Sequence, residues 1–455
     1  MASMRELQPL LPTAAEAQQL ALLRDKRILI VMGSYPGKRP MYERARQLGV
    51  KLVVLDGPGH WTQSAVQEGL FEQFIEVDLQ PANTLADRAY QAVRQSGLRF
   101  DGVATFEEFA GPLTALLAQG LGLPGHPFLS VAYCRDKTLT REVCIEAGIP
   151  SPRYFRIRSS DDLAPAADHV CFPAVLKPVS GAASISTYRV NDEAELSQRY
   201  HQTMEAVHEH LKTSGVHSDD EQEMIWANGF DMTLEQFLDG DEFDVDCLLS
   251  GGEVAYASVV HDLPQPYLKE VGSRVPPPFS EEKQTEMIAF TTEVLKVIGF
   301  TDGAFHVEVK YTSEGPRLIE VNARIGGGSI YHFHRLVWGV DLAEQYLLTR
   351  LGAPIQPNKA PAPRTYLASS DLPCSRSGIV LHADFLQPVA DHPHVLLAKT
   401  FVKAGQYVLG PDKGVPDWLG ELVVYGDSVE AADQLMADLL AQISFPVAET
   451  YRENR

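Results

Sequence analysis

Two glutamates on either side of a short hairpin are the residues of this sequence whose spacing first suggests chemistry. Residues 303–324, GAFHVEVKYTSEGPRLIEVNAR, alternate apolar and polar side chains around Ser313–Glu314–Gly315, which predicts two antiparallel strands joined by a tight turn. Glu308 and Glu320 lie equally far from Glu314 along the chain, so we expect them to face each other. Directly opposed carboxylates destabilise a sheet unless something compensates for their charge.

A divalent cation would compensate for that charge. Asn322 lies on the same side of its strand as Glu320, and two carboxylates with one amide oxygen are hard ligands that suit Mg²⁺ bridging phosphates. The alternative is that one glutamate faces solvent and the pairing is accidental. We predict a site for Mg²⁺ or Mn²⁺ at Glu308, Glu320 and Asn322.

The segment after this strand gives up side chains. Arg324 continues the same side of the strand, and Gly326, Gly327 and Gly328 follow. Glycines let a backbone approach a ligand closely and offer N–H groups to a carboxylate, which predicts a substrate contact. The alternative is a loop that needs positive φ angles for structural reasons alone.

Two histidines come next. His332 and His334 alternate with Tyr331 and Phe333, a spacing that would place both histidines on one face toward the site. A lone histidine is more often a hydrogen-bonded wall residue, and we assign neither of them a role.

Upstream, two lysines and an acidic segment could bind a nucleotide. Lys137 lies in a predicted helix, and Lys177 ends the apolar strand AVLKP beside the small-residue turn VSGAASIS, where a point charge and backbone N–H groups could contact phosphate. In LEQFLDGDEFDVD, Phe237 and Leu238 could line an adenine slot and Glu242 could accept from ribose hydroxyls. Taken singly, each feature is better explained as a surface lysine or a solvated acidic hairpin.

The first quarter of the chain predicts a small doubly wound α/β unit. Residues 27–33, 51–57, 73–79 and 100–106 are short apolar runs typical of buried parallel strands, and helical patterns lie between them. The first turn, GSYPGKRP, does not match G-x-G-x-x-G. A turn that merely requires glycine and proline is therefore favoured over a dinucleotide site.

From about residue 126 the pattern changes to longer helices and hairpins. A helix should end at Gly148, and a strand, turn and strand follow in 172–190. Further predicted elements are a polar helix, an exposed charged loop, a strand-rich stretch with an SGG hairpin, two helices, a Pro-rich link, and a strand-and-turn module closing with a strand and a helix (192–213, 214–223, 232–260, 281–300 and 339–352, 353–364, 365–443).

Composition bounds the function class. The 455 residues allow two to four domains, and the net charge of −21 argues against binding nucleic acid or an anionic membrane surface. Five scattered cysteines without a C-x-x-C pair favour a reduced, cytoplasmic protein without a disulfide framework or zinc site. We find no apolar run near the roughly 20 residues that a membrane span needs, and no secretion signal at the start.

Together, the motifs resemble the ATP-grasp superfamily. The resemblance covers about residues 20–350 and rests on an ordered set: Lys137, Lys177-Pro178 with its small-residue loop, E-x-x-L-x-G-x-E at 235–242, Glu308 and E-V-N-A-R. It implies an ATP-grasp fold of the α/β class, α+β in part. The implied segments are an N-terminal pre-ATP-grasp domain, a lid, a catalytic subdomain and a C-terminal α+β module (1–125, 126–240, 241–352, 353–455).

The resemblance also implies roles for individual residues. Those that would bind ATP are two phosphate-binding lysines, a serine in the loop over the phosphates, an adenine-binding glutamate, two residues whose backbone meets the ring, and a ribose-binding glutamate (Lys137, Lys177; Ser184; Glu235; Phe237, Leu238; Glu242). The metal would lie on Glu308, Glu320 and Asn322. Arg324 would stabilise an acyl phosphate and a tetrahedral intermediate.

Within the superfamily, EVNARIGGG and KEVGSRVPPPF (269–279) look most like the L-amino-acid ligases that make dipeptides and their carnosine-synthase-like relatives. That likeness implies a carboxylate–amine ligase that joins two L-amino acids through an acyl phosphate, releasing ADP and phosphate. Glu270 would help receive an amino group. The branch usually has a histidine three residues later, where this chain has Ser273, and this departure leaves the amino-acid specificity open.

Three other functions compete with this interpretation. An ATP-grasp ligase or carboxylase of another substrate class, as in purine biosynthesis, would share the ATP residues, although no biotinyl carrier motif is visible. A non-enzymatic ATP-binding regulator could lose Arg324 or a metal acid, and both are present. A kinase would need a P-loop or kinase motif set. The expected partners are small-molecule amino acids, with a homodimer as one option because many relatives are dimers.

Overall fold

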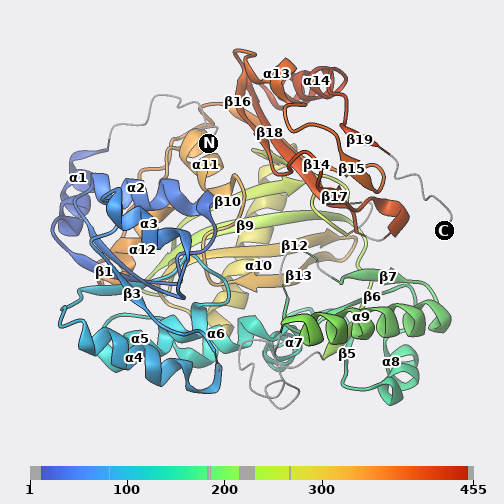
Figure 1. The fold of residues 1–455 in the computed structure, drawn as a ribbon, viewed down its shortest axis with the longest axis horizontal. Helices are drawn as coiled ribbons and strands as arrows, with labels where there is room; N and C mark the ends of the chain where they lie inside the picture. The colour runs from blue at the N-terminus through green and yellow to red at the C-terminus, as the bar shows by residue number, and fades with distance from the viewer. Residues whose placement is uncertain are drawn as a thin grey trace.

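The computed structural model describes residues 12–80, 82–181, 184, 186–214, 231–265, 268–413 and 415–448. Figure 1 shows an N-terminal α/β unit, a central sheet that crosses the molecule, a smaller sheet beside α9, and a C-terminal group of strands and helices. Within the described ranges, no helix combines the length and apolar character that a membrane crossing requires. Most of the charged loop predicted at 214–223 falls outside these ranges.

The predicted parallel unit is confirmed. Its sheet has the order β3-β2-β1-β4, with all pairings parallel. β1, β2 and β4 are short, mostly apolar runs that helices bury, as parallel sheets require, whereas the edge strand β3 buries only Ile75. The strands and then the helices of this part are: β1 (Arg27–Val31), β2 (Lys51–Asp56), β3 (Gln73–Glu76), β4 (Gly102–Ala104); α1 (Ala14–Leu20), α2 (Arg39–Gln47), α3 (Trp61–Gln67), α4 (Leu85–Gln95), α5 (Gly111–Leu121), of which α2 and α4 are the predicted crossover helices.

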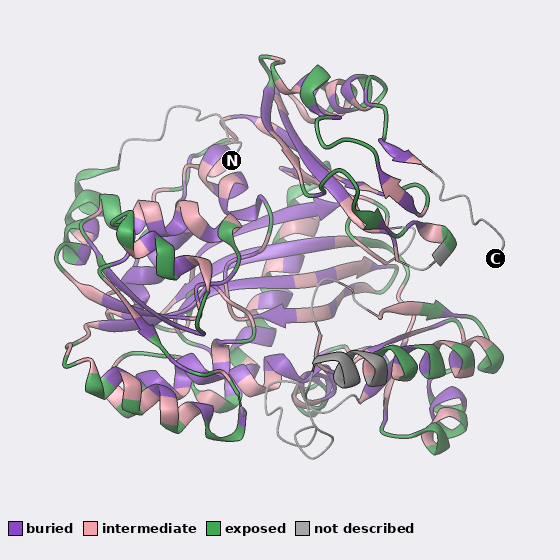
Figure 2. Ribbon diagram, viewed as in Figure 1, coloured by how far each residue is buried: buried purple, intermediate pink, exposed green. Residues whose placement is uncertain are grey.

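An eight-stranded sheet forms the centre, in the order β13-β12-β9-β10-β11-β14-β18-β16. One face packs on the helix α10 (Glu281–Ile298), and Figure 2 shows these strands as mostly buried. The SGG hairpin between β9 and β10 and the hairpin between β12 and β13 are both as predicted. The strands are β9 (Asp241–Ser250), β10 (Glu253–Asp262), β11 (Ser273–Val275), β12 (Gly303–Thr312), β13 (Gly315–Asn322), β14 (Tyr366–Pro373), β16 (Val395–Thr400) and β18 (Trp418–Gly426).

Strict alternation along β9 and β12 gives the central sheet two different faces. Phe243, Val245 and Cys247 point toward α10 together with Phe305 and Val307. The residues between them are charged or polar and point the other way. The fold therefore uses one face as core and leaves the other for a site.

The short strand β11 joins two parts of the chain that the sequence separates by a Pro-rich link. It pairs with β10 on one side and with β14 on the other, so the sheet continues past the predicted boundary at 352/353. The four-segment division of the chain stays a prediction.

Two smaller sheets complete the fold. The first, in the order β5-β8-β6-β7, lies within the segment predicted as a lid, and the second belongs to the C-terminal part. Their elements, with the neighbouring helices, are α6 (Phe128–Arg135), α7 (Lys137–Glu146), β5 (Tyr154–Ile157), α8 (Leu163–Val170), β6 (Ala174–Pro178), β7 (Tyr188–Val190), α9 (Glu193–Ser214) and β8 (Met232–Gln236); then β15 (Gly378–Val380), α13 (Gln387–Ala390), β17 (Tyr407–Val408), α14 (Val429–Leu440) and β19 (Val447–Ala448).

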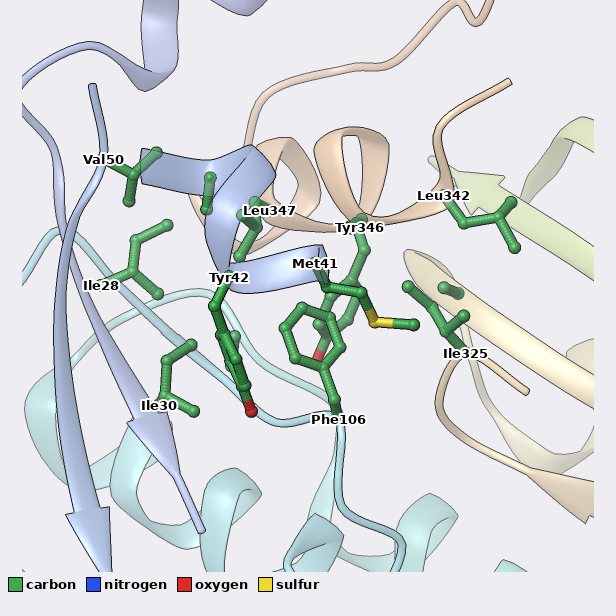
Figure 3. Close-up of a cluster of buried hydrophobic side chains, with 14 of the residues drawn as sticks. Ile28, Ile30, Met41, Tyr42, Val50, Phe106, Ile325, Leu342, Tyr346 and Leu347 are labelled. Atoms are coloured by element: carbon green, nitrogen blue, oxygen red, sulfur yellow. The ribbon is translucent and has the colours of Figure 1, made fainter. Parts of the chain in front are cut away.

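A shared apolar core fixes the N-terminal unit against the centre. Met41 and Tyr42 of α2 pack with Tyr346 of α12 (Leu342–Arg350) and with Ile325, which follows β13 (Figure 3). Met41 and Ile325 point toward each other in this view. The segment that follows β13 is therefore anchored in the core of the N-terminal unit.

The narrow connection at β11 yields a stability prediction. Gly272 has a φ of 141°, and a Cβ there would clash with the carbonyl oxygen of Ser369 on the neighbouring strand β14. We expect Gly272→Ala to destabilise the protein by at least about 2 kcal/mol, because conformational strain and a backbone clash add. Gly97→Ala is the control, since Gly97 also has a positive φ but an open surrounding. Thermal melting should show the larger loss for Gly272→Ala, and equal losses would contradict the packing argument.

Candidate active site

A cleft with about 940 Å³ of empty space lies between the lid sheet and the polar face of the central sheet. Both lobes supply its walls, β6 and β8 from one side and β9, β12 and β13 from the other. The predicted site residues that line it are Lys137, Lys177, Ser184, Glu235, Phe237, Leu238, Glu242, Glu270, Glu308 and Glu320. Tertiary structure therefore brings together residues spread over most of the ATP-grasp-like part of the sequence.

Glu308 and Glu320 face each other as predicted, but a β-bulge is what makes this possible. The turn closes with Thr312 opposite Gly315, which would pair Glu308 with Ile319 in a regular hairpin. The register shifts by one residue just beyond Val309, so that Glu308 lies opposite Glu320. Without this shift Glu320 would point toward α10, because a one-residue slip exchanges the two faces of a strand.

Arg141 holds the bulge from the neighbouring helix α7. Its Nη2 donates to the Ile319 carbonyl at 2.7 Å and lies 3.0 Å from Glu235 Oε2, and the residue is only 1% exposed. Sequence reasoning missed this residue, because nothing in the helical pattern of 137–146 separates it from a surface arginine. The site depends on it nonetheless, since it connects the lid strand β8 to the hairpin.

The two predicted phosphate-binding lysines are buried in the cleft wall, so the alternative of surface lysines is wrong for both. Lys137 Nζ donates to Glu320 Oε1 at 2.7 Å, and Lys177 Nζ lies 2.9 Å from Glu235 Oε2. Burial opposes the charge on Glu235, yet Arg141 and Lys177 together lower its pKa to about 2. Each lysine thus has a carboxylate partner in this structure and stays available to an anion in the cleft.

The residues predicted for the adenine and the ribose border the same cleft, and one of them, Glu235, is the carboxylate partner of Lys177. Phe237 and Leu238 follow β8, and the Arg189 guanidinium lies 4.4 Å from the Phe237 ring centroid. Burial raises the pKa of Glu242, whose carboxylate is 3.8 Å from Lys310 Nζ. Ser184 has a φ of 55° and borders the same space.

The predicted metal ligands form a compact set of hard oxygen donors. Burial, and next the charge of Glu320, raise the pKa of Glu308 to about 8. Asn322 Nδ2 donates to Glu308 Oε1 at 3.3 Å, so the amide lies beside the pair. The described residues contain no group of three or more His, Cys, Asp or Glu side chains arranged for a metal. A pair of facing carboxylates with one amide fits a cation that keeps its remaining ligands from phosphate or water.

Arg324 and the glycines lie beyond the cleft wall, at the junction with the N-terminal unit. We call residues 325–329 the glycine loop. Arg324 Nε donates to Glu108 Oε2 at 2.9 Å, and Arg135 also pairs with Glu108, an acid that sequence reasoning missed. Glu108 lies a few residues after β4, and only the packing of the two units shows that this acid meets Arg324.

The glycines have structural reasons as well as a predicted functional one. A Cβ on Gly326 would lie 2.9 Å from Nδ1 of His306, and Gly328 has a φ of 52°. The Gly328 N–H already donates to the Tyr35 hydroxyl at 3.0 Å. Contact of the three glycines with a substrate stays a prediction, and the Gly328 N–H has a partner within the protein.

The prediction that His332 and His334 share one face, as in a strand, is wrong because the segment is helical. His332 lies in α11 (Ile330–Phe333), and His334 begins a π-helical turn (His334–Trp338). His334 is fully buried, with Nε2 3.0 Å from Asp246 Oδ2 and Nδ1 2.8 Å from the Tyr256 hydroxyl. His334 is therefore the hydrogen-bonded wall residue of the alternative interpretation.

Glu270 and Ser273 occupy different surroundings. Glu270 borders the cleft. Ser273 of β11 is absent from the cleft wall, and its hydroxyl donates to Asp262 Oδ1 of β10 at 3.0 Å. Nearby, Asp371 of β14 lies opposite Glu421 of β18, a second facing acid pair. Burial, followed by the charge of Glu421, raises the pKa of Asp371 to about 8. The sequence offered no signal for this pair, because its strands are far apart along the chain.

Comparisons with known proteins place the chain among ATP-grasp proteins. Residues 170–332 match the model of the ATP-grasp domain, and residues 42–125 match that of the ATP-grasp N-terminal domain. Human carnosine synthase 1 is 28% identical over 347 residues, which cover 73% of this chain and 40% of that protein. The alanine–anticapsin ligase of Bacillus subtilis is 25% identical over 264 residues, 54% of this chain and 53% of that protein.

Among solved structures, the L-amino acid ligase of Bacillus licheniformis is similar over 94% of this chain and all of its own, with a TM-score of 0.74 at 23% identity. This likeness shows the fold. The chain spans about two fifths of the length of the human carnosine synthase that it matches.

The facing pair Glu308–Glu320 predicts a pH-dependent stability in the absence of divalent cations. The pKa of Glu308 rises from 4.5 to about 8 on folding, so between these values the unfolded chain loses a proton that the folded chain keeps. Stability should therefore fall as pH rises from about 4.5 to about 8 and then level off. Glu308→Gln should lack this part of the decline.

Melting temperatures between pH 5 and 9 with a chelator present would measure the effect. Glu253→Gln is the control, because that glutamate side chain is 82% exposed. If the curves of wild type, Glu308→Gln and Glu253→Gln run parallel, Glu308 does not hold a proton in the folded protein.

Proposed function

Because the chain belongs to the ATP-grasp superfamily, we propose that it is an ATP-dependent ligase that joins a carboxylate to an amine, with release of ADP and phosphate. The observation that carries the proposal is the facing pair Glu308–Glu320 in a cleft whose wall also holds two buried lysines. We further propose that both substrates are L-amino acids and that the product is a dipeptide. The names of the relatives, carnosine synthase and alanine–anticapsin ligase, support this substrate class.

In this proposal the cleft binds ATP with its phosphates toward the glutamate pair. Lys137 and Lys177 contact the phosphates, exchanging part of their interaction with Glu320 and Glu235 for the incoming anion. The segment Phe237–Leu238 borders the adenine, and Glu242 accepts from the ribose hydroxyls. Ser184 covers the phosphates.

Glu308, Glu320 and Asn322 would hold Mg²⁺ or Mn²⁺, which would supply neutralisation of the charge on the phosphates. The bulge and Arg141 keep the two carboxylates on one face, so the ligands are in place before the cation arrives. Burial and the charge of Glu320 raise the pKa of Glu308 to about 8, so a cation held there would compete with the proton on this carboxyl group.

The proposed reaction has two steps. First, a carboxylate oxygen of one amino acid attacks the γ-phosphorus of ATP, the bond from that phosphorus to the bridging oxygen breaks, and ADP leaves. Second, the amine of the other amino acid attacks the acyl carbon, the carbon–oxygen bond to phosphate breaks, and the amine passes a proton to the leaving phosphate or to a side chain. The protein contributes mainly position and charge to the first step.

Arg324 faces the oxyanion of the second step in this proposal, and its ion pair with Glu108 fixes the guanidinium. Water would hydrolyse an acyl phosphate. The lid sheet with its small-residue loop would exclude it by closing on the central sheet.

A product screen tests the function. Pairs of amino acids with ATP and Mg²⁺ should include at least one that releases phosphate in equal amount to a new amide, detected by mass spectrometry. Arg324→Ala should lose amide formation by about 100-fold or more while still binding ADP, because it removes a group that acts on the reacting atoms. If no pair releases phosphate with a new amide, the dipeptide proposal fails.

Metal dependence tests the carboxylate pair separately. Glu320→Gln should raise the Mg²⁺ concentration for half-maximal activity by about tenfold or more, because one charged ligand is lost. Glu314→Gln is the matched control, since Glu314 lies at the tip of the same hairpin with its side chain 80% exposed. An unchanged Mg²⁺ requirement in Glu320→Gln would remove Glu320 from the metal site.

A further inference from the structure

The turn after β1, residues 33–38 within GSYPGKRP, contacts the glycine loop at two points. Lys38 Nζ donates to the carbonyls of Gly326 at 2.7 Å and Ile325 at 3.3 Å. The Tyr35 hydroxyl accepts from the Gly328 N–H at 3.0 Å. One turn of the N-terminal unit thus bonds to both the carbonyl side and the amide side of a loop nearly 300 positions away in the chain.

The turn itself is held in place by several hydrogen bonds. Asp56 Oδ2 accepts from the Gly33 N–H at 2.7 Å, and the Ser34 carbonyl accepts from Trp61 Nε1 at 2.7 Å. Met32 and Ser34 have backbone φ angles of 55°, which residues other than glycine rarely adopt. A turn so constrained is suited to holding another segment rather than following it.

Tyr35 and Lys38 are placed by the small residue between them. A Cβ on Gly37 would clash with the Tyr35 ring, and Lys38 Nζ lies 5.7 Å from the centroid of that ring. Gly37 therefore serves packing within the turn, while the tyrosine and the lysine of the turn reach the other unit.

Lys38 is an unusual residue for this position, because it is only 3% exposed and forms no ion pair among the described residues. Burial, and next the neighbouring Arg324, lower its pKa to about 7. An uncharged amine still has two N–H groups, one for each of the two carbonyl groups that accept from Lys38. The bonds to the glycine loop therefore survive loss of the proton, and the loop supplies the polar contacts that this buried amine requires.

The glycine loop is also fixed at its start. Ile325 lies in the apolar core that Met41 and Tyr42 build, directly after the turn (Figure 3). Arg324, the residue directly before the glycine loop, pairs with Glu108 of the N-terminal unit. The segment 324–328 thus meets the N-terminal unit through an ion pair, an apolar side chain and three hydrogen bonds.

We propose that Lys38 and Tyr35 are positioning residues that set the conformation of the glycine loop, and through it the place of Arg324 beside the reacting carbonyl. The catalytic part of this inference rests on the proposed function. Its structural part does not, because it concerns only bonds within the protein. The N-terminal unit is then a working part of the catalytic centre, through a turn whose sequence suggested only a structural role.

Amide hydrogen exchange tests the structural part without any substrate. Tyr35→Phe removes the acceptor of the Gly328 N–H and keeps the ring, and Lys38→Met keeps the length of the side chain but removes both donors. Exchange of the peptide covering 326–330 should rise by about fivefold or more in each variant. Tyr90→Phe and Lys51→Met are matched controls, because their polar groups bond to Gly120 O and Asp25 within the same unit.

Steady-state kinetics then test the catalytic part on the full chain. Both variants should lose about tenfold or more in kcat for amide formation, while KM for ATP stays within about twofold, because the nucleotide cleft is untouched. Melting temperatures close to those of the controls would exclude general unfolding, and Tyr35→Phe keeps the test valid if Lys38→Met folds poorly.

The outcomes separate the two proposals. Exchange and kcat equal to the controls overturn the positioning role, as does faster exchange with an unchanged kcat. Faster exchange in a protein whose wild type forms no amide with any amino-acid pair leaves the link between turn and loop intact and rejects the ligase function. Faster exchange with a lowered kcat and a constant KM for ATP supports both.

Discussion

The arrangement of the site depends on one constraint, the placement of two half-buried carboxylates directly opposite each other. Glu308 and Glu320 can share a face only because one extra residue, Ile319, interrupts the regular pairing of β12 and β13. The interruption leaves a carbonyl off the ladder, and the buried Arg141 binds it. A bulge next to a site re-aims a side chain, and here it turns an acid from the α10 core into the cleft.

The same arginine links the hairpin to the opposite wall. Arg141 and Lys177 both contact Glu235 on β8, and Lys137 contacts Glu320 on β13. Positive and negative groups therefore alternate across the cleft, which lets charged side chains stay buried without an ion present. A phosphate or a divalent cation would enter this network by replacing one of its members rather than by meeting bare charges.

A second junction places the segment after β13. Glu108 binds Arg324, Lys38 and Tyr35 bind the glycine loop, and Ile325 enters the N-terminal core. The two units share one apolar core, and this favours a single orientation between them because separating them would expose apolar surface to water. The arginine and the glycines are thus positioned by residues from the opposite end of the sequence, while the glutamate pair is positioned from within the hairpin and by α7.

Much of the fold and of the cleft could be predicted, because these features have local causes. Period-two alternation in β9, β12 and β13, apolar runs in β1 to β4, and the order of motifs from Lys137 to Arg324 are all written in neighbouring residues. The residues that were missed have no local signature. Arg141 looks like any helical arginine, Glu108 like a loop acid, Lys38 like a turn residue, and the pair Asp371–Glu421 depends on strands about fifty residues apart.

The sequence by itself determined the pattern of faces and predicted many of the residues that line the cleft, because these follow from side-chain periodicity and from the order of a known set of motifs, whereas Arg324, the glycines and Ser273 lie outside the cleft wall. The pairing of Glu308 with Glu320 was predicted from a turn centred on Glu314. The turn instead closes with Thr312 opposite Gly315, and the bulge restores the predicted pairing. Only the tertiary structure decided the partners of each charge. Those partners come from other units of the chain, and the energy of burying a charge depends on what lies within a few ångströms of it, whatever its distance in sequence.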